Sequence, residues 1–385
     1  MMKATARGQR ALTMQFLPIV LYCLLFTAVT TALKRCDDCV KAVDCKPALD
    51  LLLSDRSPEA YKQLRDAACD VKGSHKVCCS SILGVRFSTD DIENNAQTTG
   101  DEIENHRNIR LLASECGDID GSRIIGGTTA GLYEFPWMAL ISYNEGGNLK
   151  FKCGGSVITA RYVMTAGHCI NKSIVGVRIG DYDISQPEDC VGEEELRECE
   201  SNYQDITVTH RIRHPKYVTE SVGVALHDIG LLRLATPVEF SYRNSGTICL
   251  PITKVLRESA LPDDHGTVAG WGATETQQQS NVLLKVQVTM YSELTCKSLY
   301  KDAFRSRPYN SNKLMNTICA GETGRDSCKG DSGGPLMVEA PYNGTYKFVQ
   351  IGIISFGLEG CGTNKPGLYT DVRKYMKWIL DTIKP

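Results

Sequence analysis

The sequence lacks an excess of charge of either sign: 43 Lys and Arg residues face 45 Asp and Glu residues, for a net charge of −2. A chain this close to neutral has no electrostatic means of binding nucleic acid or an anionic membrane surface. The sequence also lacks internal repeats, a glycine-periodic composition and a series of long apolar runs, which excludes collagen-like and multi-span membrane proteins. Apolar and charged fractions of 42% and 23% exclude wholesale disorder and allow two or three domains in 385 residues.

The one long uncharged run covers residues 11–32 and follows a basic start with Lys3, Arg7 and Arg10. A basic start, an apolar middle and a small-residue end are typical of a secretory signal peptide, so we expect residues 1–32 to be removed. The alternative is an uncleaved membrane anchor, because a run of this length can span a bilayer. Pro18 and the small residues before Ala32 favour cleavage, which predicts a secreted, extracellular protein with no membrane attachment.

Cysteine is abundant, with 17 residues, and Cys23 falls within the signal peptide. The 16 that remain are an even number, which fits a complete disulfide framework in an oxidising compartment. Six of them lie close together at positions 36, 39, 45, 69, 78 and 79. They predict a small module over residues 33–80 that needs three bridges because it cannot build a sufficient core. A zinc site on Cys36, Cys39, Cys78 and Cys79 is the alternative, and secretion disfavours it.

Residues 81–123 connect this module to the rest of the chain. Their central part, residues 88–110, holds six acids and few large apolar side chains, which predicts a flexible acidic linker. From residue 124 to residue 385, short β-branched and aromatic runs alternate with Gly, Pro and Asn, as in all-β domains. We expect strands around 156–158, 162–164, 175–179, 285–288 and 349–354, and one terminal helix over 372–380.

Three segments carry the chemistry: Thr165–Cys169 around His168, Asp228–Leu234, and Gly330–Pro335 around Ser332. Each alone has an ordinary structural interpretation, such as a turn or the end of a strand. Together, and in the order His, Asp, Ser, they closely resemble the trypsin/chymotrypsin family of serine proteases over residues 116–385. The resemblance implies a mostly β fold, a chymotrypsin-like double β-barrel with a C-terminal helix, and serine endopeptidase activity that requires no cofactor.

The chemistry explains these residue types. A serine hydroxyl is a weak nucleophile near neutral pH, so His168 should accept the proton of Ser332 and later deliver it to the leaving amine. Asp228 should hold the other imidazole nitrogen and stabilise the imidazolium. By resemblance, the backbone N–H groups of Gly330 and Ser332 form the oxyanion hole, where a donor contributes about 3 kcal/mol.

The resemblance also implies a specificity. Asp326 matches the family's pocket base, six residues before the nucleophile, and Gly357 and Gly367 match its walls. A carboxylate at the base of a roomy pocket favours a cationic side chain, so cleavage after Arg or Lys is expected.

The stretch around Arg123 and Ile124 resembles the family's activation site. Cleavage after Arg123 by an upstream trypsin-like protease would create an ammonium group on Ile124 that pairs with Asp331. A buried charge is tolerable only when it is paired, so this pair would switch the zymogen on.

The resemblance further implies a set of disulfides. The protease part should contain Cys116–Cys249, Cys153–Cys169, Cys296–Cys319 and Cys328–Cys361. Cys190 and Cys199 are additional to the plain trypsin pattern, and because only eight residues separate them we expect them to pair with each other.

The N-terminal six-cysteine module resembles the clip domain of arthropod clip-domain serine proteases, which implies the pairs Cys36–Cys78, Cys39–Cys69 and Cys45–Cys79. Such proteases act in haemolymph on secreted zymogens, in prophenoloxidase activation (melanisation), in Toll signalling through cytokine precursors, or in clotting, and serpins inhibit them. The resemblance implies an innate-immune role and these partners. A digestive or general extracellular trypsin, or a non-enzymatic clip-domain cofactor, remains the alternative.

Two weaker features complete the sequence. Asn171 and Asn343 begin Asn-x-Ser/Thr acceptors, so a secreted chain could carry glycans there. Asp189, Glu193 and Glu195 belong to a cluster of acids around Cys190 and Cys199 whose oxygens could hold calcium. A solvated acidic loop, or an exosite for a basic partner, is the alternative.

Overall fold

The computed structural model describes residues 39–41, 76–78, 101–119, 128–192, 197–219, 225–258, 265–273, 279–300, 316–321, 330–356 and 366–385. The chain divides into two units, Met1–Thr98 and Thr99–Pro385. In the first unit, β1 (Cys39–Lys41) pairs antiparallel with β2 (Lys76–Cys78), so that Cys39 faces Cys78 in the register. Cys78 is buried and disulfide-bonded.

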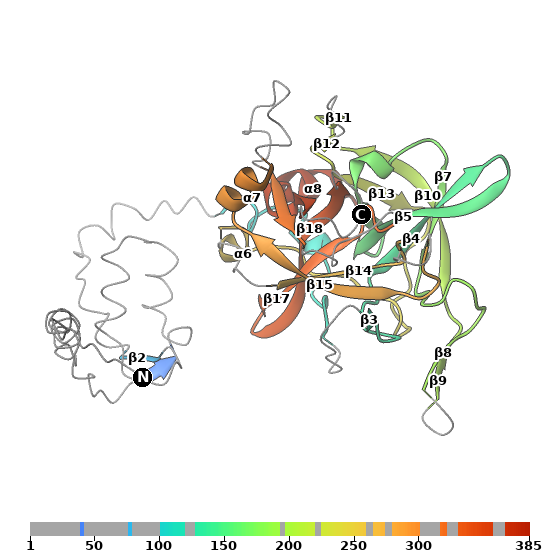
Figure 1. Ribbon diagram of the computed structural model, residues 1–385, viewed down its shortest axis with the longest axis horizontal. Coiled ribbons are helices and arrows are strands. Elements are labelled where there is room, and N and C mark those ends of the chain that lie inside the picture. Colours follow the sequence, from blue (N-terminus) through green and yellow to red (C-terminus); the bar gives the residue numbers. More distant parts are fainter. Residues whose placement is uncertain are drawn as a thin grey trace, which may run out of the picture. The chain divides into compact units, whose positions relative to one another are not determined.

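Six antiparallel strands of the second unit close into a barrel, in the order β10-β13-β6-β5-β4-β7. Their bounds are β4 (Met138–Glu145), β5 (Asn148–Thr159), β6 (Tyr162–Thr165), β7 (Ile174–Ile179), β10 (Gln204–Arg213) and β13 (Gly230–Leu234). Figure 1 shows these strands gathered on one side of the unit (green to yellow-green). Ile206 and Val208 on β10 alternate inward, as a period of two requires of a strand that lines a core.

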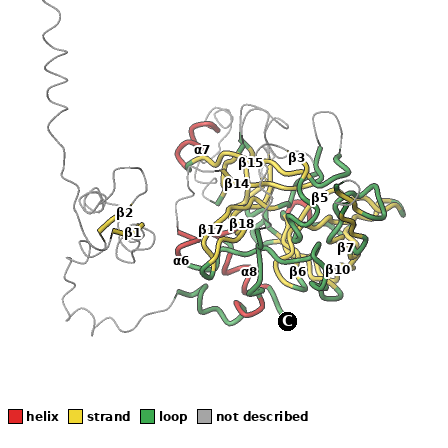
Figure 2. The backbone as a smooth tube through the Cα atoms, turned by 90° about the horizontal axis from the view of Figure 1, so that it is seen from below, coloured by secondary structure: helices red, strands yellow, loops and turns green. Residues whose placement is uncertain are grey.

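A second set of strands runs β14-β17-β18-β19-β16-β15 and closes because β14 also pairs with β15. The bounds are β14 (His265–Gly270), β15 (Leu284–Tyr291), β16 (Thr317–Ala320), β17 (Pro335–Tyr342), β18 (Thr345–Phe356) and β19 (Gly367–Asp371), with β3 (Thr128–Thr129) added to β15. Figure 2 shows the two groups of strands, with helices α6 (Lys254–Glu258) and α7 (Glu293–Tyr300) at the edge of the second. The predicted double barrel is confirmed.

Buried polar and aromatic contacts join the two barrels. Ser156 on β5 donates to Gln350 on β18 across 2.6 Å, with both side chains fully buried. Aromatic rings of Phe135 and Phe348 meet edge to face with centroids 5.6 Å apart. Because one barrel covers part of the other, the second half of β5 is buried on both of its faces. The site described below lies at this junction.

The predicted strands all fall inside observed ones, and the terminal helix is present in two parts. It begins as a 3₁₀ turn, η6 (Val372–Lys374), and continues as α8 (Met376–Thr382). The sequence pattern did not reveal α6, α7 or the short hairpins β8 (Asp189–Val191) with β9 (Glu198–Glu200) and β11 (Val218–Thr219) with β12 (Ala225–Leu226).

Residues 101–112, here called the docking segment, pack against the protease barrels. Asp101 forms an ion pair with Arg257 on α6, and the Glu104 carboxylate accepts the N–H of Lys254 at the start of that helix across 2.6 Å. Asn108 donates to the carbonyl of Leu380, across 2.8 Å, in α8. Apolar side chains of the segment also reach the core, namely Ile103, Leu111 and Leu112.

The prediction of a flexible acidic linker is therefore wrong from Asp101 onward. The acidic side chains of this segment were expected to be solvated, but the folded unit provides partners for them. Arg257 and Lys377 form ion pairs with two of the acids, and the backbone N–H at the start of α6 binds Glu104. Three apolar side chains complete the docking: Ile103, which a composition average over residues 88–110 hides, and Leu111 and Leu112, which lie just beyond that range.

The docking segment contains Arg107 and Arg110, both potential trypsin sites. We expect these bonds to resist limited digestion in the native chain, because a protease needs a locally unfolded segment. Asp101→Ala should speed cleavage there by weakening the contact with Arg257. Mass spectrometry of the fragments over time measures both rates, with the denatured chain as a reference that is cut at every Arg. Equal rates in the native chain and the variant would contradict the docked arrangement.

Candidate active site

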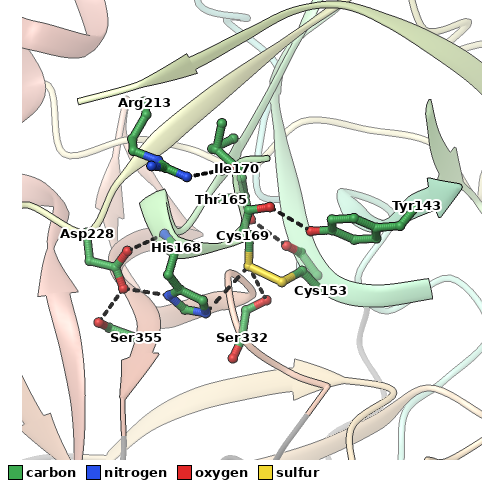
Figure 3. The surroundings of a disulfide bond; sticks show 11 residues. Tyr143, Cys153, Thr165, His168, Cys169, Ile170, Arg213, Asp228, Ser332 and Ser355 are labelled. Carbon is green, nitrogen blue, oxygen red and sulfur yellow. Dashed lines mark hydrogen bonds and ion pairs between the residues drawn. A yellow bond between two sulfur atoms is a disulfide. The ribbon is translucent and has the colours of Figure 1, made fainter. Parts of the chain in front are cut away.

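His168 lies directly after β6 in a 3₁₀ turn, η3 (Gly167–Cys169). The Cys153–Cys169 disulfide ties this turn to β5. Gly167 is required here, since an added Cβ would lie 2.8 Å from the Tyr217 ring and 3.2 Å from a carboxylate oxygen of Asp228. The turn is therefore held on two sides, which fixes the direction of the imidazole (Figure 3).

Asp228 is 1% exposed and binds His168 through both carboxylate oxygens. Its Oδ2 lies 2.8 Å from the imidazole Nδ1, and its Oδ1 accepts the backbone N–H of the same histidine at 2.7 Å. Burial raises the pKa of the carboxyl, but hydrogen bonds from His168 and Ser355 outweigh it and hold that pKa below its usual range. Asp228 is thus a buried carboxylate that remains charged and orients the imidazole.

Ser332 comes from the loop before β17, in the second barrel, and lies next to His168 (Figure 3). Its carbonyl accepts the N–H of Gly154 on β5 at 2.8 Å and lies 3.6 Å from the Cys169 sulfur. That sulfur is itself 3.6 Å from the imidazole Nε2. In Figure 3 the hydroxyl of Ser332 points away from the imidazole, so the histidine–aspartate half of the site is hydrogen-bonded and the serine is adjacent but not engaged.

The loop around Ser332 presents backbone donors. Gly330 and Gly333 have φ values of 104° and 85°, which glycine adopts without strain. Within the described residues, the N–H groups of Gly330 and Ser332 donate to no protein acceptor, whereas Gly333 donates to Ile354. An oxyanion hole requires two backbone N–H groups of this kind, free of protein acceptors and next to the nucleophilic serine oxygen.

The side chain of Asp331, the residue before Ser332, lies beside Gly270 and Gly272. One of its carboxylate oxygens accepts the N–H of Gly272 across 2.7 Å. A Cβ added at Gly270 would lie 2.1 Å from the carboxylate, and one added at Gly272 would lie 2.2 Å from it. The carboxylate therefore fills space that two glycines leave beside the barrel.

Two residues of the site were not predicted from the sequence. Ser355, at the end of β18, donates its hydroxyl to Asp228 Oδ2 across 2.6 Å. Thr370 on β19 donates to the backbone carbonyl of Asp228 across 2.8 Å. No short motif surrounds either residue, and only the closure of the second barrel brings them to the aspartate.

A stacked histidine pair lies behind Asp228. The rings of His214 and His227 are parallel within 14°, with centroids 5.0 Å apart, and Tyr375 contacts the His227 Nδ1 across 3.0 Å. Burial lowers the pKa of His214 to about 4, and the charges of His227 and Lys216 act in the same direction. Burial also lowers the pKa of His227. Both rings are therefore neutral in the folded protein near neutral pH.

This pair makes stability depend on pH. A histidine whose folded pKa is depressed stabilises the fold above its unfolded pKa, near 6.5, and the benefit is lost as pH falls toward 4. We expect thermal unfolding at pH 5 to occur several degrees below that at pH 7.5, and His214→Phe, which keeps an aromatic ring, to reduce the difference. Circular dichroism melts of both proteins measure this. An identical difference in the two proteins would exclude His214 as the source.

Four of the expected disulfides are formed. They are Cys116–Cys249, Cys153–Cys169, Cys190–Cys199 and Cys296–Cys319. Cys190 and Cys199 face each other across the β8–β9 hairpin. The disulfide between the buried Cys116 and Cys249 joins the segment before the predicted cleavage site covalently to the protease barrels.

Several predicted residues lie outside the described part of the chain. They are the signal peptide, Arg123, Ile124, Glu193, Glu195, Asp326, Gly357, and the cysteines at 36, 45, 69, 79, 328 and 361. Gly367 is described and opens β19, buried and paired with Ala320. Asn171 and Asn343 are both exposed, the second at the turn between β17 and β18. Within the described residues, no helix is long and apolar enough to cross a bilayer.

The loop with the acidic cluster is partly described. Asp189 is buried, and its two carboxylate oxygens accept the N–H groups of Tyr182 and Asp183 at 2.8 and 2.7 Å. Asp181 is also buried; one of its oxygens faces Arg178, and the other has no hydrogen-bond partner within the described residues. Burial raises the pKa of Asp181 to about 6. Asp189 thus shapes the loop, and Asp181 carries a buried oxygen that lacks a donor.

Comparison with known proteins agrees with this geometry. The trypsin family matches residues 124–379. Melanization protease 1 of Drosophila melanogaster is 34% identical over 369 residues, 90% of each chain, and Phenoloxidase-activating factor 3 of Holotrichia diomphalia is 35% identical over 357 residues, 90% of this chain and 91% of that one. A crystal structure of the Drosophila Grass clip serine protease of the Toll pathway has a TM-score of 0.60 and 30% identity, covering 89% of this chain and 93% of that one.

The double barrel and the family match define the chain as a trypsin-like serine endopeptidase. Within that class, it belongs to the clip-domain serine proteases of the melanization and Toll cascade family.

Proposed function

We propose that the chain is a secreted zymogen that, once cleaved after Arg123, cuts other secreted zymogens after Arg or Lys in an innate-immune cascade. The observation that carries the proposal is the charged Asp228 bound to His168 through both oxygens, with Ser332 alongside. The names of relatives in melanization, phenoloxidase activation and the Toll pathway support the cascade role.

The chemistry follows from this arrangement. Asp228 holds the proton of His168 on Nδ1, which leaves Nε2 free to accept the proton of Ser332 as its oxygen attacks the substrate carbonyl. The oxyanion that forms would be stabilised by the N–H groups of Gly330 and Ser332. The imidazolium then protonates the leaving amine, and a water molecule completes hydrolysis of the acyl-enzyme by the same route.

The Ser332 hydroxyl must rotate toward His168 for this step. Cleavage would create an ammonium group on Ile124, and its pairing with Asp331 would order the loop around Ser332. We propose that this ordering turns the Ser332 hydroxyl toward His168. Asp326 would bind the cationic substrate side chain between Gly357 and Gly367. An upstream trypsin-like protease would make the activating cut, and serpins would be the expected inhibitors.

The direct test is an assay on activated protein. The chain is cleaved after Arg123, and hydrolysis is measured on short chromogenic peptides that end in Arg, Lys or Phe. We expect the Arg and Lys peptides to be cleaved at least about a hundredfold more efficiently, since a pocket carboxylate left without a cationic partner costs several kcal/mol. Sequencing of new N-termini in cell-free plasma then identifies the zymogens cut. A folded, cleaved sample that hydrolyses none of the peptides would refute the proposal.

We also propose that the acidic loop holds a structural calcium ion that takes no part in catalysis. The unpartnered oxygen of Asp181 fits a cation, because a buried acceptor without a donor costs free energy. Asn244, which donates to the carbonyl of neighbouring Gly180, likewise has an unpartnered side-chain oxygen. Glu193 and Glu195 would add carboxylates from the same loop.

Calcium should then raise the thermal stability of the protein. A ligand at 100 times its dissociation constant stabilises the fold by about 2.7 kcal/mol, which corresponds to several degrees in melting temperature. Asp181→Asn should remove the increase, whereas Asp205→Asn, an exposed acid that pairs with the same Arg178, should keep it. Melts in excess calcium chloride and in a chelator provide the comparison. Identical melts of the unmodified protein in the two solutions would exclude the ion.

A further inference from the structure

We infer that three exposed cations beside the active site, Lys172, Arg211 and Arg213, recognise acidic side chains of protein substrates near the cleaved bond. These residues are called the cationic surface below. The inference rests on the proposed peptidase function and adds a substrate class to it: segments that combine the cleaved Arg or Lys with nearby Asp or Glu residues.

Arg213 lies close to the catalytic histidine. The Tyr217 ring packs against the backbone of Gly167, the residue before His168. The Arg213 guanidinium lies over that ring, 4.6 Å from its centroid, and donates to the carbonyl of Ile170, two residues after His168. Figure 3 shows this side chain reaching toward Ile170 beside the His168–Asp228 pair.

Arg211 and Lys172 extend the same surface. Arg211 is two residues before Arg213 on β10, so both side chains leave the same face of the strand. Its Nε donates to the carbonyl of Ile174 across 2.9 Å. Lys172 is exposed in the loop between Ile170 and Ile174, the two residues that the arginines contact. Three positive charges therefore surround a single loop.

Within the described part of the chain, no neighbouring acid neutralises these charges. Among the described residues, none of the three forms an ion pair, whereas Arg178 pairs with Asp181 and Asp205. Carbonyl contacts orient the two guanidinium groups without cancelling their charge. Each guanidinium has five N–H donors, so several stay available for a carboxylate. Arginines held in this way bind carboxylates with less loss of side-chain entropy than free ones.

The location favours a substrate segment as the binding partner. A polypeptide cleaved by Ser332 must pass His168, and residues near its cleaved bond then come within reach of the loop at Ile170–Ile174. A protein with a net charge of −2 has no general attraction for acids, so an acidic substrate segment would be attracted by the local charge of these three residues and not by the net charge of the chain. The surface would raise the association rate and fix the register of acidic substrates.

Matched peptides test the inference on the activated, full-length enzyme. Each peptide has one Arg and carries either Glu or Gln at positions before, or after, the cleaved bond. The readout is the ratio of kcat/KM for the Glu peptide to kcat/KM for its Gln partner. The protein is deglycosylated first, because a glycan on Asn171 would stand beside Lys172. We expect a ratio of roughly 5 to 20 in at least one series at low salt, which falls as salt screens exposed charges.

Variants connect the ratio to the cationic surface. Arg211→Gln with Arg213→Gln should bring the ratio close to one, and Arg211→Lys with Arg213→Lys should keep most of it because the charge remains. Arg161→Gln is the matched control: this arginine also donates to a backbone carbonyl, that of Ala235, but directly precedes β6, whereas His168 follows the other end of that strand. Its ratio should equal that of the unmodified enzyme.

The outcomes separate this inference from the proposed function. Cleavage of the peptides with a ratio of one in both series would overturn the inference and leave the peptidase intact. Failure to cleave any Arg peptide would overturn the proposed function itself. Binding to immobilised heparin that the Gln variant loses, together with a ratio of one, would assign the surface to a sulfated polysaccharide and also overturn the inference.

Discussion

Ser332→Ala should reduce kcat on an Arg-peptide substrate by roughly 10⁵-fold or more, as expected when a serine protease loses its nucleophile. No other hydroxyl occupies the position next to His168 Nε2 in the described site; Ser355 donates to Asp228 Oδ2, the oxygen that contacts the other imidazole nitrogen, Nδ1. Initial rates of the activated variant, measured at high enzyme concentration, give the value. Some rate above that of water should remain, since the backbone donors of Gly330 and Ser332 persist.

The control for this variant is Ser185→Ala, an exposed serine in the loop before β8, which should retain full activity. Melting curves establish that both variants are folded. Activity of Ser332→Ala within tenfold of the unmodified enzyme would mean that a different group attacks the substrate, and the proposed mechanism would have to be abandoned.

Asp228→Asn should lower kcat by about 10⁴-fold. The carboxylate accepts two N–H groups of His168 and the hydroxyl of Ser355, whereas an amide must offer N–H at one of these positions. The imidazole would then turn its unprotonated nitrogen toward the asparagine and present N–H to Ser332, which cannot accept the serine proton. Steady-state kinetics of the activated variant measure the loss.

Ser355→Ala provides the graded comparison. It removes one hydrogen bond to a charged group, worth about 1.5–3 kcal/mol, and leaves the His168–Asp228 contact in place, so its loss of kcat should be far smaller than that of the asparagine variant. Equal losses in the two variants would show that the Ser355 hydrogen bond matters as much as the carboxylate itself, and would contradict the role of Asp228 in fixing the tautomer.

Much of the protease fold could be predicted because its signals are local. β-branched runs such as those within β7 and β18 alternate with turn residues, and each lies inside an observed strand. The motifs around His168 and Ser332 are also local, and the resemblance that they carry supplied the pairing of Cys116 with Cys249 across 133 positions. Short-range pattern and family likeness together were enough for the double barrel.

The remaining features depend on contacts that no local pattern encodes. Ser355 and Thr370 reach Asp228 only because the second barrel closes against the first. Asp101 and Glu104 looked like solvated charge until α6 supplied their partners. The orientation of the Ser332 hydroxyl depends on a loop conformation that the sequence Gly-Asp-Ser-Gly-Gly permits but does not dictate.

The docking segment has a consequence for the fate of the N-terminal part after a cut at Arg123. Two different interactions would keep that part attached as a light chain. One is the buried Cys116–Cys249 disulfide, and the other is the noncovalent packing of the docking segment, residues 101–112, against α6 and α8. If the disulfide were reduced, the contacts of the docking segment would still hold the N-terminal part. If those contacts were lost, the disulfide would still hold it. The mature enzyme would therefore be a two-chain molecule that keeps its N-terminal module after activation.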